Sequence, residues 1–306
     1  MVFSPTPGVS ARLGTCQMIE VTIIGLLLGG SYALIAMGLQ LQYGVARIMN
    51  LANGEILVAG SFGAFWLYTG SKLSPILSIF IVMPLAFVFN WLIYRYLLRP
   101  LVRRAKNHGQ LEVDSILATF GITFIMVGLM LAIFGGDYFN YSYLAVPFNI
   151  LGKPYALNRI MAFLMSALLG IALYVWIYRT RSGMTLRAVS VSSQASELVG
   201  INVPLVLALA FSLGGAVTAA GGALLSMFLT FDASIGVVFT MKALIIVIMG
   251  GVGDIRGAII AAFILGLAET AVASWVDPGL TLAAAYLLFI LVLLFRPQGL
   301  FGRQSS

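Results

Sequence analysis

Charged residues are scarce in this chain. Of its 306 residues, 17 are lysine or arginine and 10 are aspartate or glutamate, whereas 61% are apolar and the mean hydropathy is +1.05. Soluble globular chains average about 25% charged residues, and disordered chains combine low hydrophobicity with high charge, so this composition excludes both classes. The composition indicates a membrane protein.

Metal-ligating and redox side chains are almost missing as well. The chain has one cysteine, Cys16, and one histidine, His108. One residue of each kind is too few for an intramolecular disulfide or for a zinc site of the cysteine/histidine type. We therefore expect no bound metal and no cofactor held by this chain. They also leave little acid–base or nucleophilic machinery for a membrane enzyme.

The excess of positive charge is modest, +7 with a pI near 9.7, and it is not gathered on one polar face. The basic residues form short clusters between long uncharged stretches, which is the pattern of membrane topology. We therefore expect contact with a lipid bilayer and none with nucleic acid.

Most of the uncharged stretches reach the ~20 residues that cross a bilayer as a helix. They are 21–46, 73–94, 115–136, 160–178, 198–231, 257–268 and 278–295, and two shorter apolar segments are 56–68 and 237–250. Backbone polar groups in lipid must be satisfied within the segment, and these lengths favour helices over barrel strands. The sequence predicts an all-α, polytopic bundle of eight or nine transmembrane helices over residues 18–306, with residues 1–17 as a disordered extension.

Three basic clusters predict the orientation. They are Arg95, Arg99, Arg103, Arg104 and Lys106; Arg179, Arg181 and Arg187; and Arg296 with Arg303. The positive-inside rule places all three in the cytoplasm and residues 137–155 outside. Nine spans put the N-terminus outside, whereas a re-entrant segment would reduce the count to eight and move that terminus.

Small residues recur at intervals of four, which keeps them on one helix face and lets neighbouring backbones approach closely. The stripes are Ala258, Ala262, Gly266, Thr270 and Ser274; Gly214, Thr218, Gly222 and Ser226; and Gly25 with Gly29. They predict tight helix packing.

Three charged residues, Glu55, Lys242 and Glu269, stand in apolar surroundings. Each costs at least ~2.5–3.5 kcal/mol to insert, so such residues usually face the bundle interior. Lys242 and Glu269 lie 11 and 16 residues from Gly253 on opposite arms of a helical hairpin, so their depths differ by about 7 Å. An ion pair between them is one hypothesis, and snorkelling of each side chain toward the headgroups is the other.

The polar segment from Asn50 through Asn53 and Gly54 to Glu55 lies between two apolar runs. Asparagine and glycine loosen a helix, and broken helices expose backbone groups to solutes in transporters. An ordinary cytoplasmic loop that caps the next helix is the alternative.

Two further segments are candidate cytoplasmic elements. Residues 179–204 have the pattern of a short amphipathic helix with a stop at Gly200, which favours a docking element over a plain surface loop. Residues 250–257 form a glycine-rich bend without the lysine and hydroxyl residue of a P-loop, and no P-loop occurs elsewhere in the chain. ATP hydrolysis through a P-loop is therefore excluded.

Several of these segments together resemble one family. The runs NLANGE, RTRSGMTLRAVS, ASELVGINV, MKALIIVIMGGVGDIRGAIIAAFILGLAE and LLFILVLLFRPQGLFG are similar to the LivH-type permease subunits of branched-chain amino acid ABC importers. The resemblance extends over residues 18–302. It implies a second permease subunit of the LivM type, two ABC ATPase subunits that bind ATP and Mg, a periplasmic solute-binding protein, and a location in the bacterial cytoplasmic membrane. Related permeases take up urea, amides or aromatic acids, so the solute stays open.

The resemblance also implies roles for residues. The solute pathway would include Asn50, Asn53, Gly54, Glu55, Lys242 and Glu269. The loop that couples the permease to the ATPases would include Arg187, Ala188, Glu197, Gly200, Ile201 and Asn202. The cytoplasmic glycine turn is Gly250, Gly251, Gly253, Asp254 and Gly257. The outer aromatic residues Tyr138, Phe139, Tyr141 and Tyr143 would meet the binding protein or form an interfacial belt.

Rival functional classes remain. A stand-alone secondary transporter would need ion-coupling carboxylates within the membrane, for which Glu269 is the candidate. A channel would need a ring of charges or a filter, and the sequence has no clear pattern of either kind.

Overall fold

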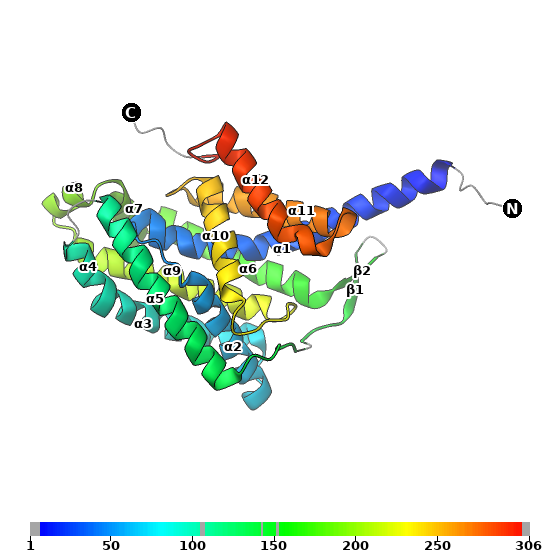
Figure 1. The fold of residues 1–306 in the computed structure, drawn as a ribbon, viewed down its shortest axis with the longest axis horizontal. Coiled ribbons are helices and arrows are strands. Elements are labelled where there is room, and N and C mark those ends of the chain that lie inside the picture. The colour runs from blue at the N-terminus through cyan, green and yellow to red at the C-terminus, as the bar shows by residue number, and fades with distance from the viewer. Residues whose placement is uncertain (1–6, 105–107, 142, 151–152, 302–306) are drawn as a thin grey trace.

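The protein is a bundle of helices, seen here in a computed structural model that describes residues 7–104, 108–141, 143–150 and 153–301 (Figure 1). Its first half contains α1 (Pro7–Ala46), α2 (Asn53–Ser71), α3 (Pro75–Ile93), a π-helical turn (Tyr94–Leu98), α4 (Arg99–Arg104), α5 (His108–Phe134), β1 (Pro147–Ile150) and β2 (Lys153–Ala156). Its second half contains α6 (Leu157–Arg179), α7 (Arg181–Val191), α8 (Ser193–Leu198), α9 (Val203–Leu225), α10 (Gly236–Gly250), α11 (Ile255–Trp275), a 3₁₀ turn (Pro278–Leu280) and α12 (Thr281–Phe295).

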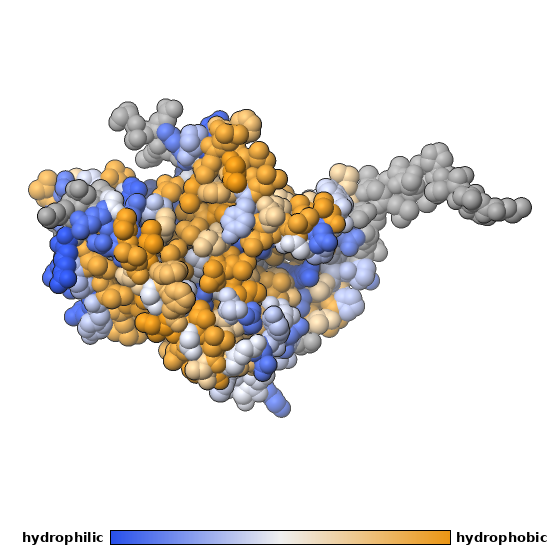
Figure 2. Space-filling model, viewed as in Figure 1, coloured by the Kyte–Doolittle hydropathy of each residue, from blue (hydrophilic) through white to orange (hydrophobic). Residues whose placement is uncertain are grey.

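Among the residues that the structure describes, seven helices are long and apolar enough to cross a membrane, as the uncharged stretches predict. α2 and α10 correspond to the two shorter apolar segments, and α10 has only 15 residues. The prediction of a polytopic helical bundle is therefore confirmed. Figure 2 shows the apolar surface over most of the visible face, with hydrophilic residues gathered at the end where α4 and α8 lie.

The bundle is built around α9. In its membrane-spanning window 78% of the residues are buried, against 6% for α12, and α9 packs against α1, α2 and α3. Glycines allow this packing. A Cβ at Gly214 would overlap the carbonyl oxygen of Gly38 on α1, and one at Gly222 would overlap that of Leu57 on α2. The four-residue stripes are thus contact seams, as predicted.

The ends of the chain differ in part from the predictions. Residues 7–17 continue α1 as helical backbone, and residues 1–6 lie outside the described residues, so disorder over residues 1–17 stays a prediction. Lys106 and Arg303 of the basic clusters also lie outside the described residues. Residues 147–150 and 153–156 pair as the antiparallel strands β1 and β2, which the prediction of an all-α fold does not include.

Candidate functional site

The chain between α1 and α2 breaks inside the helical bundle. Arg47 has a positive φ of 54°, which turns the chain away from the axis of α1 after Ala46. Asn53, the first residue of α2, accepts a hydrogen bond of 3.0 Å from Thr218 Oγ1 on α9. Thr218 is 15 residues into the 23-residue α9, or about 22 Å along it. α2 therefore begins about two-thirds of the way along α9, inside the bundle. Asn50, Asn53 and Glu55 are buried there, so an ordinary exposed loop is the wrong interpretation of residues 50–55.

The first turns of α2 and α10 meet at this depth. The backbone N–H of Gly54 donates to Thr240 Oγ1 at 2.8 Å, and Thr240 Oγ1 in turn donates to the carbonyl of Leu51 at 3.1 Å. A Cβ at Gly54 would overlap the carbonyl oxygen of Gly236, so only glycine allows this approach. Two helix N-termini, with their partial positive charge, thus lie side by side in the interior.

Polar atoms without partners surround this junction. Glu55 is 0% exposed, and neither of its carboxylate oxygens has a hydrogen-bond partner. The Nδ2 donor of Asn53, also 0% exposed, has none either. An unsatisfied buried polar group costs about 1–3 kcal/mol, and more when it is charged, so groups left in this state mark a functional site.

Asn50 stabilises the turn between α1 and α2. Its Nδ2 donates to Gln42 Oε1 at 3.0 Å, and its Oδ1 accepts from the N–H of Ala52 at 3.1 Å. Gln42 itself donates to the carbonyl of Phe211 on α9. The side chain of Asn50 is therefore fully engaged in holding the turn, in contrast to those of Asn53 and Glu55.

A second polar cluster joins α1, α10 and α11. Lys242 Nζ lies 2.8 Å from Glu269 Oε2, so the ion-pair hypothesis is confirmed and snorkelling is wrong for both side chains. Tyr32 completes the cluster. Its hydroxyl donates to the same carboxylate oxygen at 2.8 Å and accepts from Lys242 at 2.8 Å. Glu269 Oε1 is buried without a partner, which leaves one acceptor free inside the bundle.

Apart from Asn50, which holds the turn, the predicted pathway residues fall into two groups. Asn53, Gly54 and Glu55 form one group, and Lys242 and Glu269 form the other. Sequence reasoning missed Tyr32, Thr218 and Thr240, which hydrogen-bond to these groups. Thr218 was visible only as a member of a packing stripe. Tyr32 and Thr240 are single polar side chains in apolar helices, and nothing in their local sequence separates them from ordinary helix residues.

The predicted coupling segment is two helices, α7 and α8, instead of one. Ser192 ends α7 and caps α8, its side chain accepting from the N–H of Ala195. Gly200 has a φ of +81°, which ends the segment as predicted. Asn202 caps α9 by accepting from the N–H of Leu205. Of the predicted coupling residues, Ile201 is half-buried, while Arg187, Ala188, Glu197, Gly200 and Asn202 are exposed.

The surface of this segment is apolar as well as charged. Leu198 is 90% exposed and Val199 is 75% exposed at the tip of α8. On the opposite side, Leu186 and Val189 are buried in a cluster with α9. A firmly seated element with exposed apolar side chains outside the membrane is typical of a protein docking surface.

The glycine turn has a structural explanation. Gly251 and Gly253 have φ values of 103° and 87°, and Asp254 Oδ1 caps α11 by accepting from the N–H groups of Arg256 and Gly257. A Cβ at Gly257 would overlap the carbonyl oxygen of Gly250. The carbonyl of Gly250 also accepts from the N–H of Phe301, which ties the C-terminal segment to the turn.

The outer aromatic residues mostly pack inward. Phe139 pairs with Phe231 in a short β-bridge and packs against Phe62 and Phe65 on α2. Tyr141 is buried, with its hydroxyl 2.8 Å from Ser226 Oγ, and burial raises the pKa of Tyr141 to about 12, so it stays neutral. Tyr138, 79% exposed, is free to meet a partner.

A bundle of apolar helices in which two helices begin side by side in the interior, with unpartnered polar groups beside them, is typical of a membrane transport protein. The sequence profile of the family described as "Branched-chain amino acid transport system / permease component" matches residues 21–295, and the chain belongs to this family. It is thus a multi-pass protein of the inner membrane and a transport permease.

Curated relatives agree with this assignment. The high-affinity branched-chain amino acid transport system permease protein BraD of Pseudomonas aeruginosa is 30% identical, with 91% of this chain and 94% of BraD covered. LivH of Escherichia coli is 28% identical with the same coverage, and the probable LivH of Methanocaldococcus jannaschii is 26% identical with 88% of each chain covered. Among solved structures, PsaBC from Streptococcus pneumoniae in complex with Fab has a TM-score of 0.49 and 11% identity, covering 96% of this chain and 98% of the other.

Proposed function

We propose that this chain is the permease subunit of an ABC importer that carries branched-chain amino acids into the cell. Its proposed partners are a second permease subunit of the LivM type, two ABC ATPase subunits and a periplasmic solute-binding protein. The names of the relatives support the solute class. The sequence supports the ATPase partners, because the chain has no P-loop of its own.

The observation that carries the proposal is the junction of α2 and α10. An amino acid has one positive and one negative group, and the junction offers complements to both. The unpartnered carboxylate of Glu55 suits an ammonium, while the paired helix N-termini and the free Nδ2 of Asn53 suit a carboxylate. Both sets of groups lie within the membrane-spanning bundle. A passing solute loses its hydration there, and these groups could replace the lost hydrogen bonds.

The junction is closed in this structure, because Glu55 and Asn53 are both 0% exposed. Passage therefore requires the first turns of α2 and α10 to separate. In the proposed cycle, ATP binding closes the ATPase subunits, and α7 and α8 carry that movement to α9, against which they pack. Nucleotide can shift this equilibrium only by its different affinity for the two states.

The proposed coupling surface gives a specific prediction. Leu198→Glu places a charge on the exposed apolar tip of α8, where an ATPase groove would have to desolvate it. We expect ATP-driven uptake to fall at least about tenfold, since burying an unpaired charge costs well over 1.4 kcal/mol. Uptake and coupled ATP hydrolysis are measured in proteoliposomes.

Gln194→Glu is the matched control, because it adds the same charge to an exposed position of α8 without removing an apolar side chain. The solute affinity of the binding protein should be the same in both preparations. Unchanged uptake and ATP hydrolysis in Leu198→Glu would show that α8 does not dock on the ATPase.

The solute is identified by competition. The permease is co-expressed with the genes next to its own, and uptake of labelled leucine is measured against excess unlabelled isoleucine, urea, acetamide or benzoate. We expect isoleucine alone to compete. Absent uptake of labelled leucine, together with uptake of labelled urea, acetamide or benzoate, would assign the permease to one of those solute classes instead.

A further inference from the structure

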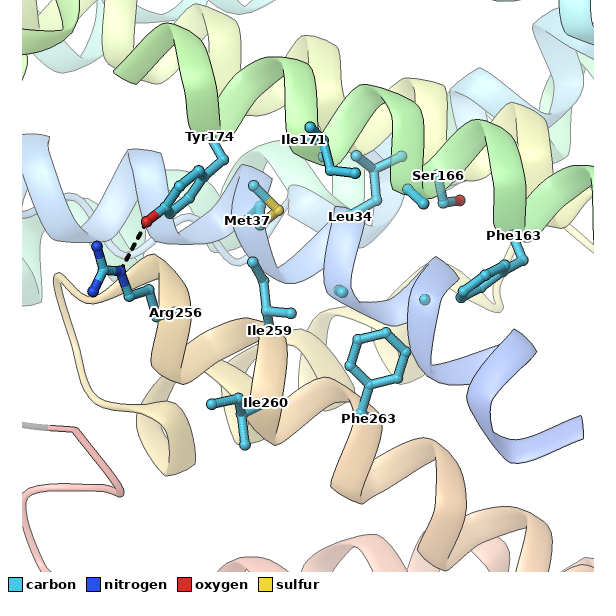
Figure 3. Close-up of a pocket in the computed structure, with 14 residues that line it drawn as sticks. Leu34, Met37, Phe163, Ser166, Ile171, Tyr174, Arg256, Ile259, Ile260 and Phe263 are labelled. Atoms are coloured by element: carbon cyan, nitrogen blue, oxygen red, sulfur yellow. Dashed lines mark hydrogen bonds between the residues drawn. The ribbon is translucent and has the colours of Figure 1, made fainter. Parts of the chain in front are cut away.

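A groove opens on the side of the bundle formed by α1, α6 and α11, away from the junction of α2 and α10. Its volume is about 440 Å³, and its walls are almost entirely apolar (Figure 3). Ile171 on α6 is 63% exposed and Ile260 on α11 is 42% exposed, so the groove faces the bilayer. The proposed transport cycle does not use this groove.

The groove is as long as one leaflet of a bilayer. It extends along α6 from Tyr174 to Phe163, where Phe163 and Phe263 line the far end. These 11 residues correspond to about 16 Å, close to half of the ~30 Å hydrocarbon core. The groove is therefore long enough for the upper part of one acyl chain, and its apolar lining suits a hydrocarbon chain.

The cytoplasmic end of the groove carries two arginines, Arg256 and Arg187, whose positive charge the nearby carboxylate of Asp254 offsets only in part. Arg256 lines it and donates from Nε to the hydroxyl of Tyr174 at 2.8 Å. Arg256 also lies over the ring of Tyr178 at 5.4 Å, and Arg187 lies over the same ring at 5.0 Å. Among the described residues, the ion pair found is that of Lys242 with Glu269. Within that part of the chain, neither Arg256 nor Arg187 therefore has a side-chain nitrogen within 4.0 Å of a carboxylate oxygen. Arg256 keeps its two Nη groups as donors beyond the bond to Tyr174, and Arg187 adds a second guanidinium beside the same ring, so both can donate to a phosphate.

We propose that this groove binds an anionic phospholipid of the cytoplasmic leaflet. One acyl chain fills the groove between α1, α6 and α11, and the headgroup phosphate lies between Arg256 and Arg187. Anionic lipids are concentrated in that leaflet, and each nearby arginine adds about fivefold to their binding. Because α7 carries Arg187, the bound lipid fixes the proposed coupling segment to the membrane-spanning helices.

The test is native mass spectrometry of the purified importer complex, titrated with dioleoyl phosphatidylglycerol or dioleoyl phosphatidylcholine. We expect the wild type to retain phosphatidylglycerol more strongly than phosphatidylcholine. Arg256→Gln should lower phosphatidylglycerol retention about fivefold and phosphatidylcholine retention less, because the choline cation offsets the charge of the phosphate in phosphatidylcholine. Arg103→Gln, which removes an exposed arginine of another cytoplasmic cluster, is the charge-matched control.

Gly170→Leu tests the groove itself. A Cβ at Gly170 meets only Met37 Sδ at 3.5 Å, an ordinary contact, so the leucine fits and its side chain fills the groove. Retention of both lipids should fall in Gly170→Leu and stay unchanged in Leu168→Phe, which adds bulk on the exposed face of α6.

Three results would overturn the proposal. They are equal retention of the two lipids by the wild type, unchanged retention in Gly170→Leu, and displacement of phosphatidylglycerol by an equal concentration of inorganic phosphate. None of them depends on which solute is transported, so the lipid site and the proposed function stand or fall separately.

Discussion

Gly54→Leu is expected to abolish uptake and to lower the thermal stability of the permease markedly. Leucine is a better helix former than glycine by nearly 1 kcal/mol, so helix propensity alone predicts a stabilised α2. The contact with α10 outweighs this gain in helix propensity, because a Cβ at Gly54 would overlap the carbonyl oxygen of Gly236. Overpacking costs about 1–3 kcal/mol or more, and it would also separate the Gly54 N–H from Thr240.

Gly70→Leu is the matched control, since Gly70 lies on the same helix and a Cβ there meets nothing within 4 Å. Thermal unfolding in detergent and ATP-driven uptake are measured for both variants. Normal uptake and stability in Gly54→Leu would mean that the first turns of α2 and α10 do not touch in the working protein.

Lys242→Met is expected to cost about 3–5 kcal/mol, since it leaves the buried carboxylate of Glu269 without its cation. Tyr32 still donates to that carboxylate and cannot neutralise it. The double variant Lys242→Met, Glu269→Gln carries no buried charge, so it should unfold at a higher temperature than either single variant.

The unfolding temperatures of the wild type, the two single variants and the double variant are measured in the same detergent. The differences among these four values report the coupling between Lys242 and Glu269. A double variant at least as unstable as the worse single variant would show that the two charges do not stabilise each other. Uptake by the double variant separates the two roles of the pair. Lost uptake in a stable double variant would place the charges in transport, whereas retained uptake would make them structural.

Much of the fold was predictable from the sequence because the bilayer limits the options. Apolar length and the absence of charge decide which segments span, and these signals located the long apolar helices together with α2 and α10, but not α4 or the division of α7 from α8. The small-residue stripes predicted contact seams because spacing of four fixes a helix face. The β1–β2 hairpin was missed, since residues 147–156 carry no clear alternation of apolar and polar side chains.

The site was only partly predictable. Lys242 and Glu269 were paired correctly because charge is expensive in the membrane and the hairpin fixes their depth. Residues 50–55 were recognisable as a break, yet its depth depends on packing against α9, which no local pattern encodes. The meeting of α2 with α10 joins residues that are about 180 apart in sequence, and tertiary packing alone brings them together.

The central claim is that this chain moves solute only as part of an ATP-driven complex. The direct measurement is the initial rate of leucine uptake into proteoliposomes that contain the purified permeases with or without the ATPase subunits. Binding protein and leucine are supplied outside, and a proton or sodium gradient is imposed in parallel samples. We expect uptake only when the ATPase subunits and ATP are both present, whatever the gradient. Gradient-driven uptake by this chain without ATPase subunits would contradict the account and make the protein a secondary transporter.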